Sequence, residues 1–141
     1  MKKYFIDSNL IVYANDCRDP EKQDKALELI SELMTSERGV VSTQVLQEFA
    51  NAALLKLKQR HEVVIRQLNL LESFEVIQIT PTMIRRAIEI RAAYAISFWD
   101  ATIISAAENA GCDVIYSEDL NAGQFYSGIR LENPFRPRGR S

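Results

Sequence analysis

Four acidic residues stand where a chain of alternating strands and helices would bring them together: Asp7, Glu48, Asp100 and Asp119. Asp7 and Asp119 follow short apolar runs, whereas Glu48 and Asp100 lie on the apolar sides of helical patterns. A carboxylate that faces a protein interior is costly unless it is paired or bound to a cation. Several carboxylates in one pocket also repel each other and favour a divalent metal ion. The pattern therefore indicates metal-dependent chemistry on phosphates.

Carboxylate oxygens without histidine or cysteine select hard cations such as Mg²⁺ or Mn²⁺. Such an ion binds phosphate oxygens and lowers the pKa of water, while the carboxylates hold the ion and orient the attacking water. Ser8, Asn9 and Ser117 neighbour the acids and could add hydrogen bonds there. Small polar residues at such positions more often satisfy the backbone of turns.

Each acid also has a structural interpretation. Asp7, in Asp-Ser-Asn, fits a helix N-cap, and Asp119 fits an Asx turn. Asp100 fits a capping box begun by Ser97, but it also shares a face with a stripe of apolar residues, which capping does not require. Singly, each acid is more often structural than functional; their joint placement favours a site.

The acids depend on the elements around them. Apolar runs predict strands at 3–6, 40–43, 74–79, 113–117 and, as an edge strand, 129–131; helical periodicity predicts helices at 9–15, 20–37, 44–57, 61–73, 83–95 and 97–110. This alternation predicts an α/β fold, with three α/β/α layers around a mainly parallel sheet of four to five strands. Ligands of such sheets bind beyond the carboxyl ends of the strands, where Asp7 and Asp119 are expected.

Length and composition set further limits. The 141 residues, 47% of them hydrophobic and 26% charged, predict a single domain over 1–141, with about 134–141 as a flexible basic tail whose RPRGRS ending could include a cloning remnant. No apolar run is long enough for a membrane span or a signal peptide, so we expect an intracellular, cytoplasmic protein without a membrane partner. A net charge of −2 gives the whole surface no attraction for nucleic acid, although basic residues cluster at 56–60 and 85–91.

Missing motifs narrow the chemistry. The chain has a single histidine and no Gly-rich phosphate loop, which argues against histidine triads, P-loop enzymes and dinucleotide binding. Asn9 disfavours a phosphatase built on an Asp-x-Asp pair. Cys17 and Cys112 match no metal spacing and are expected to be ordinary thiols. Trp99 could stack on a base, although a tryptophan that opens a helix more often packs into the core.

Four segments together resemble the PIN-domain family, and specifically VapC-type toxins of toxin–antitoxin pairs. They are FIDSNLIVYA, STQVLQEFANA, SFWDATIISAA and VIYSEDLNAGQ, which follow the family's order and spacing over nearly the whole chain. Each segment alone is weak evidence for this family, whereas the four together are a specific signature of it. The resemblance implies a parallel α/β/α fold, a Mg²⁺- or Mn²⁺-dependent endoribonuclease, often a homodimer, and inhibition by a small antitoxin at the acidic pocket.

Carried over by position, the resemblance makes Asp7 and Asp100 the main metal ligands. Glu48 becomes an acid that helps to hold metal or water, and Asp119 becomes the fourth acid, with Ser117 as the preceding hydroxyl. Ser8 stands where many relatives have threonine. Glu118 neighbours Asp119 and could substitute for it.

The resulting hypothesis is a metal-dependent endoribonuclease that hydrolyses RNA phosphodiesters with Asp7, Glu48, Asp100 and Asp119, and that acts as the toxin of a toxin–antitoxin pair. One alternative is a non-catalytic module of the same fold, whose acids cap helices and bind a basic partner peptide. Another is a DNA nuclease that uses the same site. The target RNA, the number of metal ions and the antitoxin are not encoded in these motifs.

Overall fold

The structure, a computed structural model, describes residues 1–136. Every predicted helix and strand has a counterpart with similar bounds. The strands are β1 (Tyr4–Ile6), β2 (Gly39–Ser42), β3 (Glu75–Ile77), β4 (Val114–Tyr116), β5 (Phe125–Tyr126) and β6 (Ile129–Glu132). The helices are α1 (Ser8–Ala14), α2 (Pro20–Ser36), α3 (Thr43–Leu55), α4 (His61–Leu71), α5 (Pro81–Tyr94) and α6 (Phe98–Asn109).

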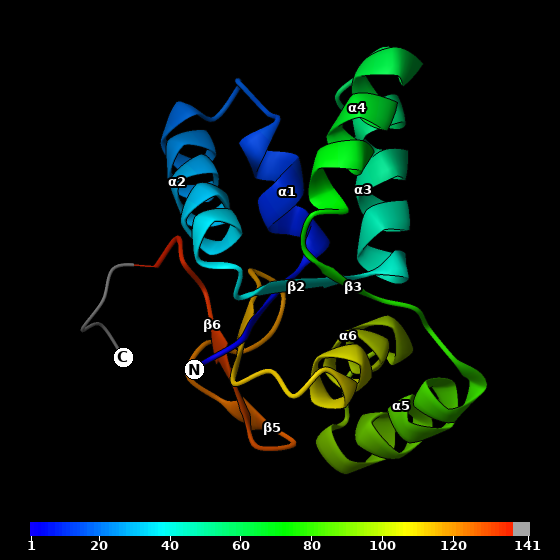
Figure 1. The fold of residues 1–141 in the computed structure, drawn as a ribbon. Coiled ribbons are helices and arrows are strands. Elements are labelled where there is room, and N and C mark those ends of the chain that lie inside the picture. The colour runs from blue at the N-terminus through cyan, green and yellow to red at the C-terminus, as the bar shows by residue number, and fades with distance from the viewer. Residues whose placement is uncertain (137–141) are drawn as a thin grey trace.

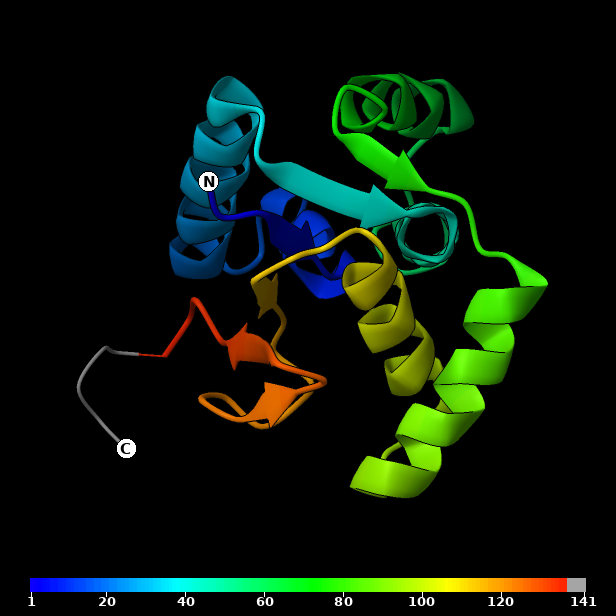
Figure 2. The same cartoon turned by 60° about the horizontal axis from the view of Figure 1, so that its bottom comes forward.

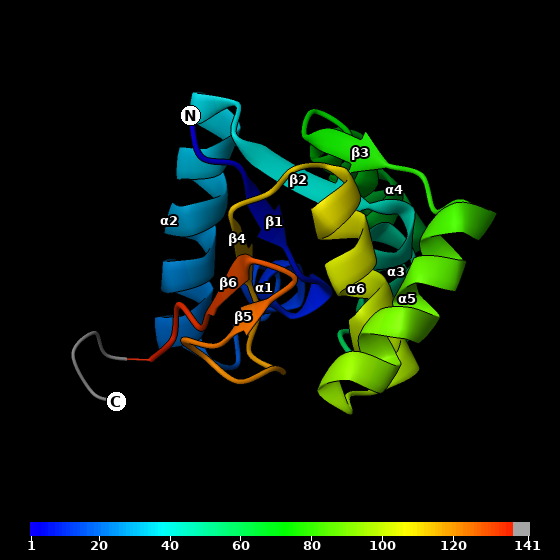
Figure 3. The ribbon, with the colours of Figure 1, turned by 90° about the horizontal axis from the view of Figure 1, so that it is seen from below.

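One sheet crosses the middle of the molecule, with strand order β3-β2-β1-β4-β6-β5 (Figure 3). All neighbouring strands pair in parallel except β5 and β6, which are antiparallel. The chain moves outward from β1 to β3 and then returns to β4 on the other side of β1. Because parallel crossovers are right-handed, this reversal places α5 and α6 on the opposite face from α1 to α4 (Figure 1). The predicted three-layer α/β/α fold is confirmed.

The far edge of the sheet differs from the prediction. Residues 129–131 were expected to form the edge strand, but β6 lies between β4 and β5, and β5 forms the edge in the described part of the chain. Ser127 and Gly128 both have positive φ, of 51° and 78°, which is the backbone of a two-residue hairpin turn. The turn folds Phe125–Tyr126 back onto β6, so the sheet has six strands instead of four or five (Figure 2).

Side-chain caps fix where the helices begin. Ser42 accepts a hydrogen bond from the Val45 amide at the start of α3, and Ser97 accepts one from the Asp100 amide at the start of α6, at 3.2 and 3.1 Å. Asp7 is the N-cap of α1. Each cap satisfies an amide that the first helical turn leaves free. The caps therefore determine which residues of α1, α3 and α6 stand in the first turn, close to the strand ends.

The core lies between the sheet and both helical layers. The central strands are buried on both faces, as parallel strands require, through residues such as Phe5, Val41 and Ile115. Phe49 of α3 and Ile104 of α6 are fully buried in the same cluster. Because α3 and α6 are both anchored in this core, the acids near their first turns are held against the sheet.

Phe135 packs edge-to-face on Tyr13, with ring centroids 5.1 Å apart. The predicted flexible tail, 134–141, therefore includes a residue that contacts α1, namely Phe135, while 137–141 lie outside the described residues. The extent of the domain stays a prediction. Within 1–136, no helix is long and apolar enough to cross a membrane. Cys17 and Cys112 are free thiols, the latter buried.

Candidate active site at the carboxyl ends of β1 and β4

Asp7 is the most buried of the four acids, with 4% of its surface exposed. It follows β1 directly, and its Oδ1 accepts a hydrogen bond of 2.7 Å from the Ser8 amide. Its Oδ2 accepts one of 2.7 Å from the hydroxyl of Ser117, which follows β4. Adjacent strands β1 and β4 thus deliver both residues to one point, where the strand order of the sheet reverses. This is where open α/β sheets bind ligands.

Glu48 reaches the same point from α3. Its Oε1 accepts a hydrogen bond of 3.0 Å from the Ser8 hydroxyl, and its Oε2 accepts one of 3.3 Å from Nε2 of the Gln44 side chain. The carboxylate is half-buried and fixed through both of its oxygens. Ser8 therefore connects two of the predicted acids, because it contacts Asp7 through its amide and Glu48 through its hydroxyl.

Asp100 and Asp119 form the outer part of the cluster. Asp100 is half-buried in the first turn of α6, and Asp119 is exposed in the loop after β4. The amide of Asp119 donates a hydrogen bond of 3.1 Å to Ser117 Oγ, which places this acid beside the pair formed by Ser117 and Asp7. Only half of the predicted capping box is formed: among residues 1–136, no hydrogen bond joins the Asp100 carboxylate to the Ser97 amide.

Mutual repulsion shows that the acids share one electrostatic environment. Burial raises the pKa of Asp7 to about 7 against the hydrogen bonds from Ser117 and Ser8, and the charges of Asp119 and Glu48 raise it further. Partial desolvation and then the charge of Asp100 raise the pKa of Asp119, while a hydrogen bond from Asn9 acts in the opposite direction. All four acids are thus electrostatically linked within one cluster.

No arginine or lysine neutralises this cluster in the described part of the chain. The ion pairs within residues 1–136 involve other acids, namely Asp16, Glu62, Glu75, Glu89, Glu108, Glu118 and Glu132. The cluster therefore has no cationic partner within residues 1–136, and the negative charge that it carries at the edge of the sheet is uncompensated. Such a charge favours binding of a cation.

The donor atoms fit a hard divalent ion. They are all oxygens, and the buried Asn9 Oδ1 beside them has no hydrogen-bond partner. Within 1–136, no three acidic, histidine or cysteine side chains already converge as a set of metal ligands. An ion of the Mg²⁺ type does not need such a cage, since it keeps several waters and binds through one or two carboxylates. Asp7, Glu48, Asp100 and Asp119 are the candidate ligands for such an ion.

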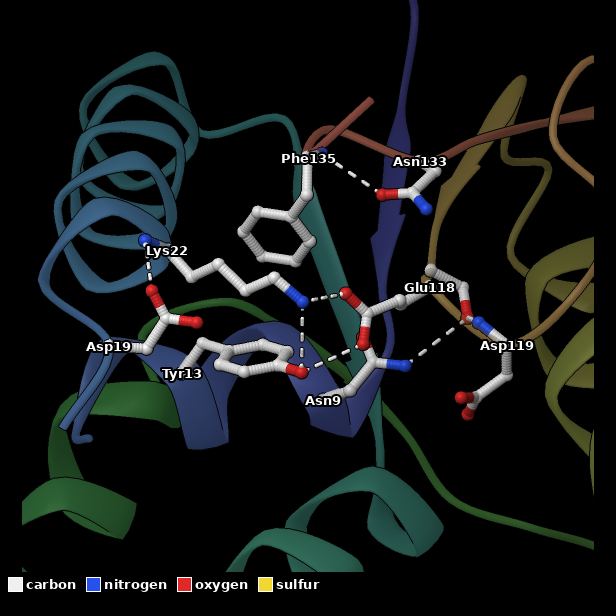
Figure 4. A network of polar contacts seen from close by, with 9 residues as sticks. Asn9, Tyr13, Asp19, Lys22, Glu118, Asp119, Asn133 and Phe135 are labelled. Atoms are coloured by element: carbon white, nitrogen blue, oxygen red, sulfur yellow. Dashed lines mark hydrogen bonds and ion pairs between the residues drawn. The ribbon is translucent and has the colours of Figure 1, made fainter. Parts of the chain in front are cut away.

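The Glu118 side chain points toward Lys22 and Tyr13, away from the carboxylate of Asp119 (Figure 4). Lys22 of α2 donates a hydrogen bond of 2.5 Å to its Oε2, and the Tyr13 hydroxyl donates one of 2.8 Å to its Oε1. The Lys22 ammonium also lies 4.5 Å from the centroid of the Tyr13 ring. Because both carboxylate oxygens of Glu118 are bonded to Lys22 and Tyr13, the structure disfavours the alternative that Glu118 substitutes for Asp119. It leaves Asp119 as the acid next to Asp100.

Two polar residues near the site were missed by the sequence analysis. Gln44, 8% exposed, donates to Glu48, and Thr102, 5% exposed, donates a hydrogen bond of 2.5 Å to Gln44 Oε1. The available signal was spacing, because Gln44 precedes Glu48 by one helical turn on the same face. Lys22 was also missed, and its contact with Glu118, 96 positions away, left no local signal.

Trp99 does not pack into the core. It is 66% exposed beside Asp100 and contacts Phe98 edge-to-face, at 5.2 Å between ring centroids. The core-packing interpretation of this tryptophan is therefore wrong. An exposed indole at the rim of an acidic site remains available to stack on a base.

The sequence profile of the PIN domain family matches residues 4–126. The match spans all four acids, and the chain belongs to this family. The PIN-domain resemblance drawn from the four segments is thus confirmed. No curated protein matches the chain significantly.

Solved structures with the same fold include a toxin and several toxin–antitoxin complexes. A toxin–antitoxin complex from Klebsiella pneumoniae matches with a TM-score of 0.70 and 18% identity, over 96% of this chain and 100% of that one. DNA-bound VapBC from Salmonella typhimurium gives 0.69 and 19%, over 95% and 99%. VapC20 from Mycobacterium tuberculosis, described as a sarcin–ricin loop cleaving toxin, gives 0.66 and 20%, over 83% and 90%. At these identities the likeness establishes a shared fold.

Proposed function

We propose that this protein is a divalent-metal-dependent endoribonuclease, the toxin of a VapC-type toxin–antitoxin pair. The observation that carries the proposal is the set of four carboxylates at the β1/β4 edge with no cationic partner among the described residues. Membership of the PIN domain family and the fold shared with VapC proteins support it.

In this proposal Asp7 and Asp100 hold the metal, Mg²⁺ or Mn²⁺, and Glu48 and Asp119 complete the negative charge around it. When bound, the ion would lower the pKa of water and neutralise charge on the scissile phosphate. Ser117 and Ser8 keep the Asp7 carboxylate in place through its two oxygens. Glu48, which accepts a hydrogen bond from the Ser8 hydroxyl, would orient the attacking water and accept its proton.

The RNA would be held by side chains at the rim. Trp99 stands exposed next to Asp100 and offers a stacking surface for an unpaired base. Lys56, from the basic cluster at 56–60, is exposed. Partial burial raises the pKa of Glu118, the hydrogen bonds from Lys22 and Tyr13 lower it, and the charge of the nearby Lys56 makes a smaller contribution in the same direction as these bonds. A cation at this distance could neutralise a backbone phosphate while leaving the four acids unpaired.

The proposed partners follow from the same assignment. A small antitoxin with basic residues would complement the negative pocket, and the protein would act in the cytoplasm as a homodimer. Co-expression with the small open reading frame expected immediately upstream tests the antitoxin, because the two proteins should copurify. Analytical ultracentrifugation of the isolated protein tests the dimer.

RNA cleavage with Mg²⁺ or Mn²⁺ tests the activity. The wild type should cut RNA, and Asp7→Asn and Asp100→Asn should each lose at least about a hundredfold in rate, a loss typical of removing electrostatic stabilisation at a reacting centre. Asp24→Asn, at an exposed position on α2, is the control and should cleave normally. Undiminished cleavage by both site variants would defeat the proposal.

Asp7 does cap α1, as the non-catalytic binding module predicts. That rival expects no metal affinity, whereas the proposed nuclease should melt at a higher temperature with Mn²⁺, because a ligand of the native state stabilises it. A comparison of RNA and DNA of the same sequence separates the ribonuclease from a DNA nuclease.

A further inference from the structure

Gln44 links two of the helices that carry the acids. It lies in the first turn of α3, and its Nε2 donates hydrogen bonds of 3.3 Å both to Glu48 Oε2 and to the Trp99 carbonyl of α6. Its Oε1 accepts the bond from the Thr102 hydroxyl. The side-chain amide of Gln44 therefore has both its nitrogen and its oxygen engaged in hydrogen bonds. Two of these bonds, to Trp99 and from Thr102, join it to the part of α6 that contains Asp100.

This amide completes a continuous series of hydrogen bonds through the site. From α6 the series passes through Gln44 to Glu48, from Glu48 through Ser8 to Asp7, and from Asp7 through Ser117 to the amide of Asp119. Gln44 is the member that joins α6 to the others. Without it, nothing in this series fixes Glu48 relative to the helix that carries Asp100.

We propose that Gln44 is a positioning residue of the nuclease site, which holds the Glu48 carboxylate in register with Asp100 through its bonds to Trp99 and Thr102. The inference rests on the proposed function and assigns Gln44 no contact with substrate. Outer residues that orient metal-binding carboxylates typically affect metal affinity by 10–100-fold. The 3.3 Å bonds from Gln44 are long, which places the expected effect at the lower end, about tenfold.

A methionine at position 44 isolates this role. It keeps the length and much of the volume of glutamine but cannot form hydrogen bonds. The Thr102 hydroxyl retains a second acceptor, the Trp99 carbonyl at 2.6 Å, so Gln44→Met leaves it paired and should fold. Gln44→Glu provides a second variant, because it places a carboxylate against Glu48 and removes the donated bonds. Gln47→Met is the control, at an exposed position on the same helix.

The experiment measures the Mn²⁺ dissociation constant, kcat and KM for RNA, and the melting temperature. We expect Gln44→Met to weaken Mn²⁺ binding about tenfold and to lower kcat while KM for RNA stays within twofold. Gln44→Glu should lower kcat at least as far, and Gln47→Met should match the wild type. In a Glu48→Gln background, Gln44→Met should weaken Mn²⁺ binding no further, because its effect passes through the Glu48 carboxylate.

Two results would overturn the inference: wild-type Mn²⁺ affinity and kcat in Gln44→Met, or an undiminished effect of Gln44→Met in the Glu48→Gln background. In both cases a wild type that binds Mn²⁺ and cleaves RNA leaves the proposed function intact. A wild type that does neither removes the proposed function, and the role of Gln44 with it.

Discussion

The hydroxyl of Ser117 donates a hydrogen bond of 2.7 Å to Oδ2 of Asp7, across 110 positions of sequence. The same hydroxyl oxygen accepts a bond from the Asp119 amide, so a fully buried serine connects the innermost acid to the outermost loop acid. A threonine or valine here would add volume where the structure has no free surface. Serine provides both bonds in the smallest space.

Ser117→Ala should lower the free energy of unfolding of the metal-free protein by about 1–3 kcal/mol, because it leaves a buried carboxylate oxygen and an amide without partners. It should also weaken Mn²⁺ binding. Urea denaturation and Mn²⁺ titration measure the two effects. The control is Ser105→Ala, which removes another buried hydroxyl, bonded to the Met83 carbonyl at 2.8 Å. That variant should lose stability only; equal loss of Mn²⁺ affinity in both would contradict the prediction.

The stability of the metal-free protein should depend on pH through Asp7. Burial raises the pKa of this carboxyl from 3.8 to about 7, so the folded state binds its proton more tightly than the unfolded state does. The contribution of Asp7 to stability is therefore largest at low pH and is lost as the pH rises from about 4 to 7, by about 4 kcal/mol at most. Asp7→Asn removes this dependence and should be more stable than the wild type at pH 8.

Denaturation of both proteins in EDTA from pH 5 to 8 measures the difference. The wild type should lose stability relative to Asp7→Asn as the pH rises. Saturating Mn²⁺ should reverse the order at pH 8, since only the wild type keeps the full set of acids. A difference that stays constant with pH would show that Asp7 ionises normally.

Lys22→Met should destabilise the protein by about 1 kcal/mol, a modest loss because both partners of the ion pair are partly exposed, at 32% and 29%. In a Glu118→Gln background the same change should cost less, since the neutral amide no longer needs the cation. Lys25→Met, at an exposed position on α2, is the matched control. Additive losses in the double variant would mean that Lys22 acts through its contact with the Tyr13 ring and not through Glu118.

Gly39→Ala should destabilise the fold by about 1–3 kcal/mol, as overpacking of a core typically does. A Cβ at this position would lie 2.5 Å from Cε1 of Phe74 and 3.3 Å from Cβ of Leu33. Thermal denaturation measures the loss. Phe74→Leu removes the ring and should relieve the clash, so Gly39→Ala should cost less in that background than in the wild type. An equal cost in both would point to backbone effects.

Periodicity and turn residues were sufficient to predict the helices, the central parallel strands and the edge of the sheet where the acids gather. Asp7 could be placed because a buried run must end at a polar turn, and Glu48 because it shares a face with Val45 and Ala52. The predictions succeeded where a residue and its near neighbours in sequence determine the local structure and the face on which a side chain lies.

The sequence analysis failed where the position or environment of a residue depends on partners far away in the sequence. The edge hairpin rests on a Ser-Gly turn with positive φ at both residues, and no strand was predicted at Phe125–Tyr126, before this turn. Gln44 and Thr102 meet only after α3 and α6 pack on the sheet. Glu118 and Asp119 are neighbours with the same charge, and only the position of Lys22 on α2 separates their surroundings.

The reversal of strand order between β1 and β4 means that the acids come from widely separated segments of the chain. No fragment shorter than the stretch from residue 7 to residue 119 contains all of them. A chain still on the ribosome would thus lack part of the acid cluster until Asp119 has been translated and has emerged from the exit tunnel. If the proposed ribonuclease activity holds, this delay would protect the message being translated from the unfinished chain.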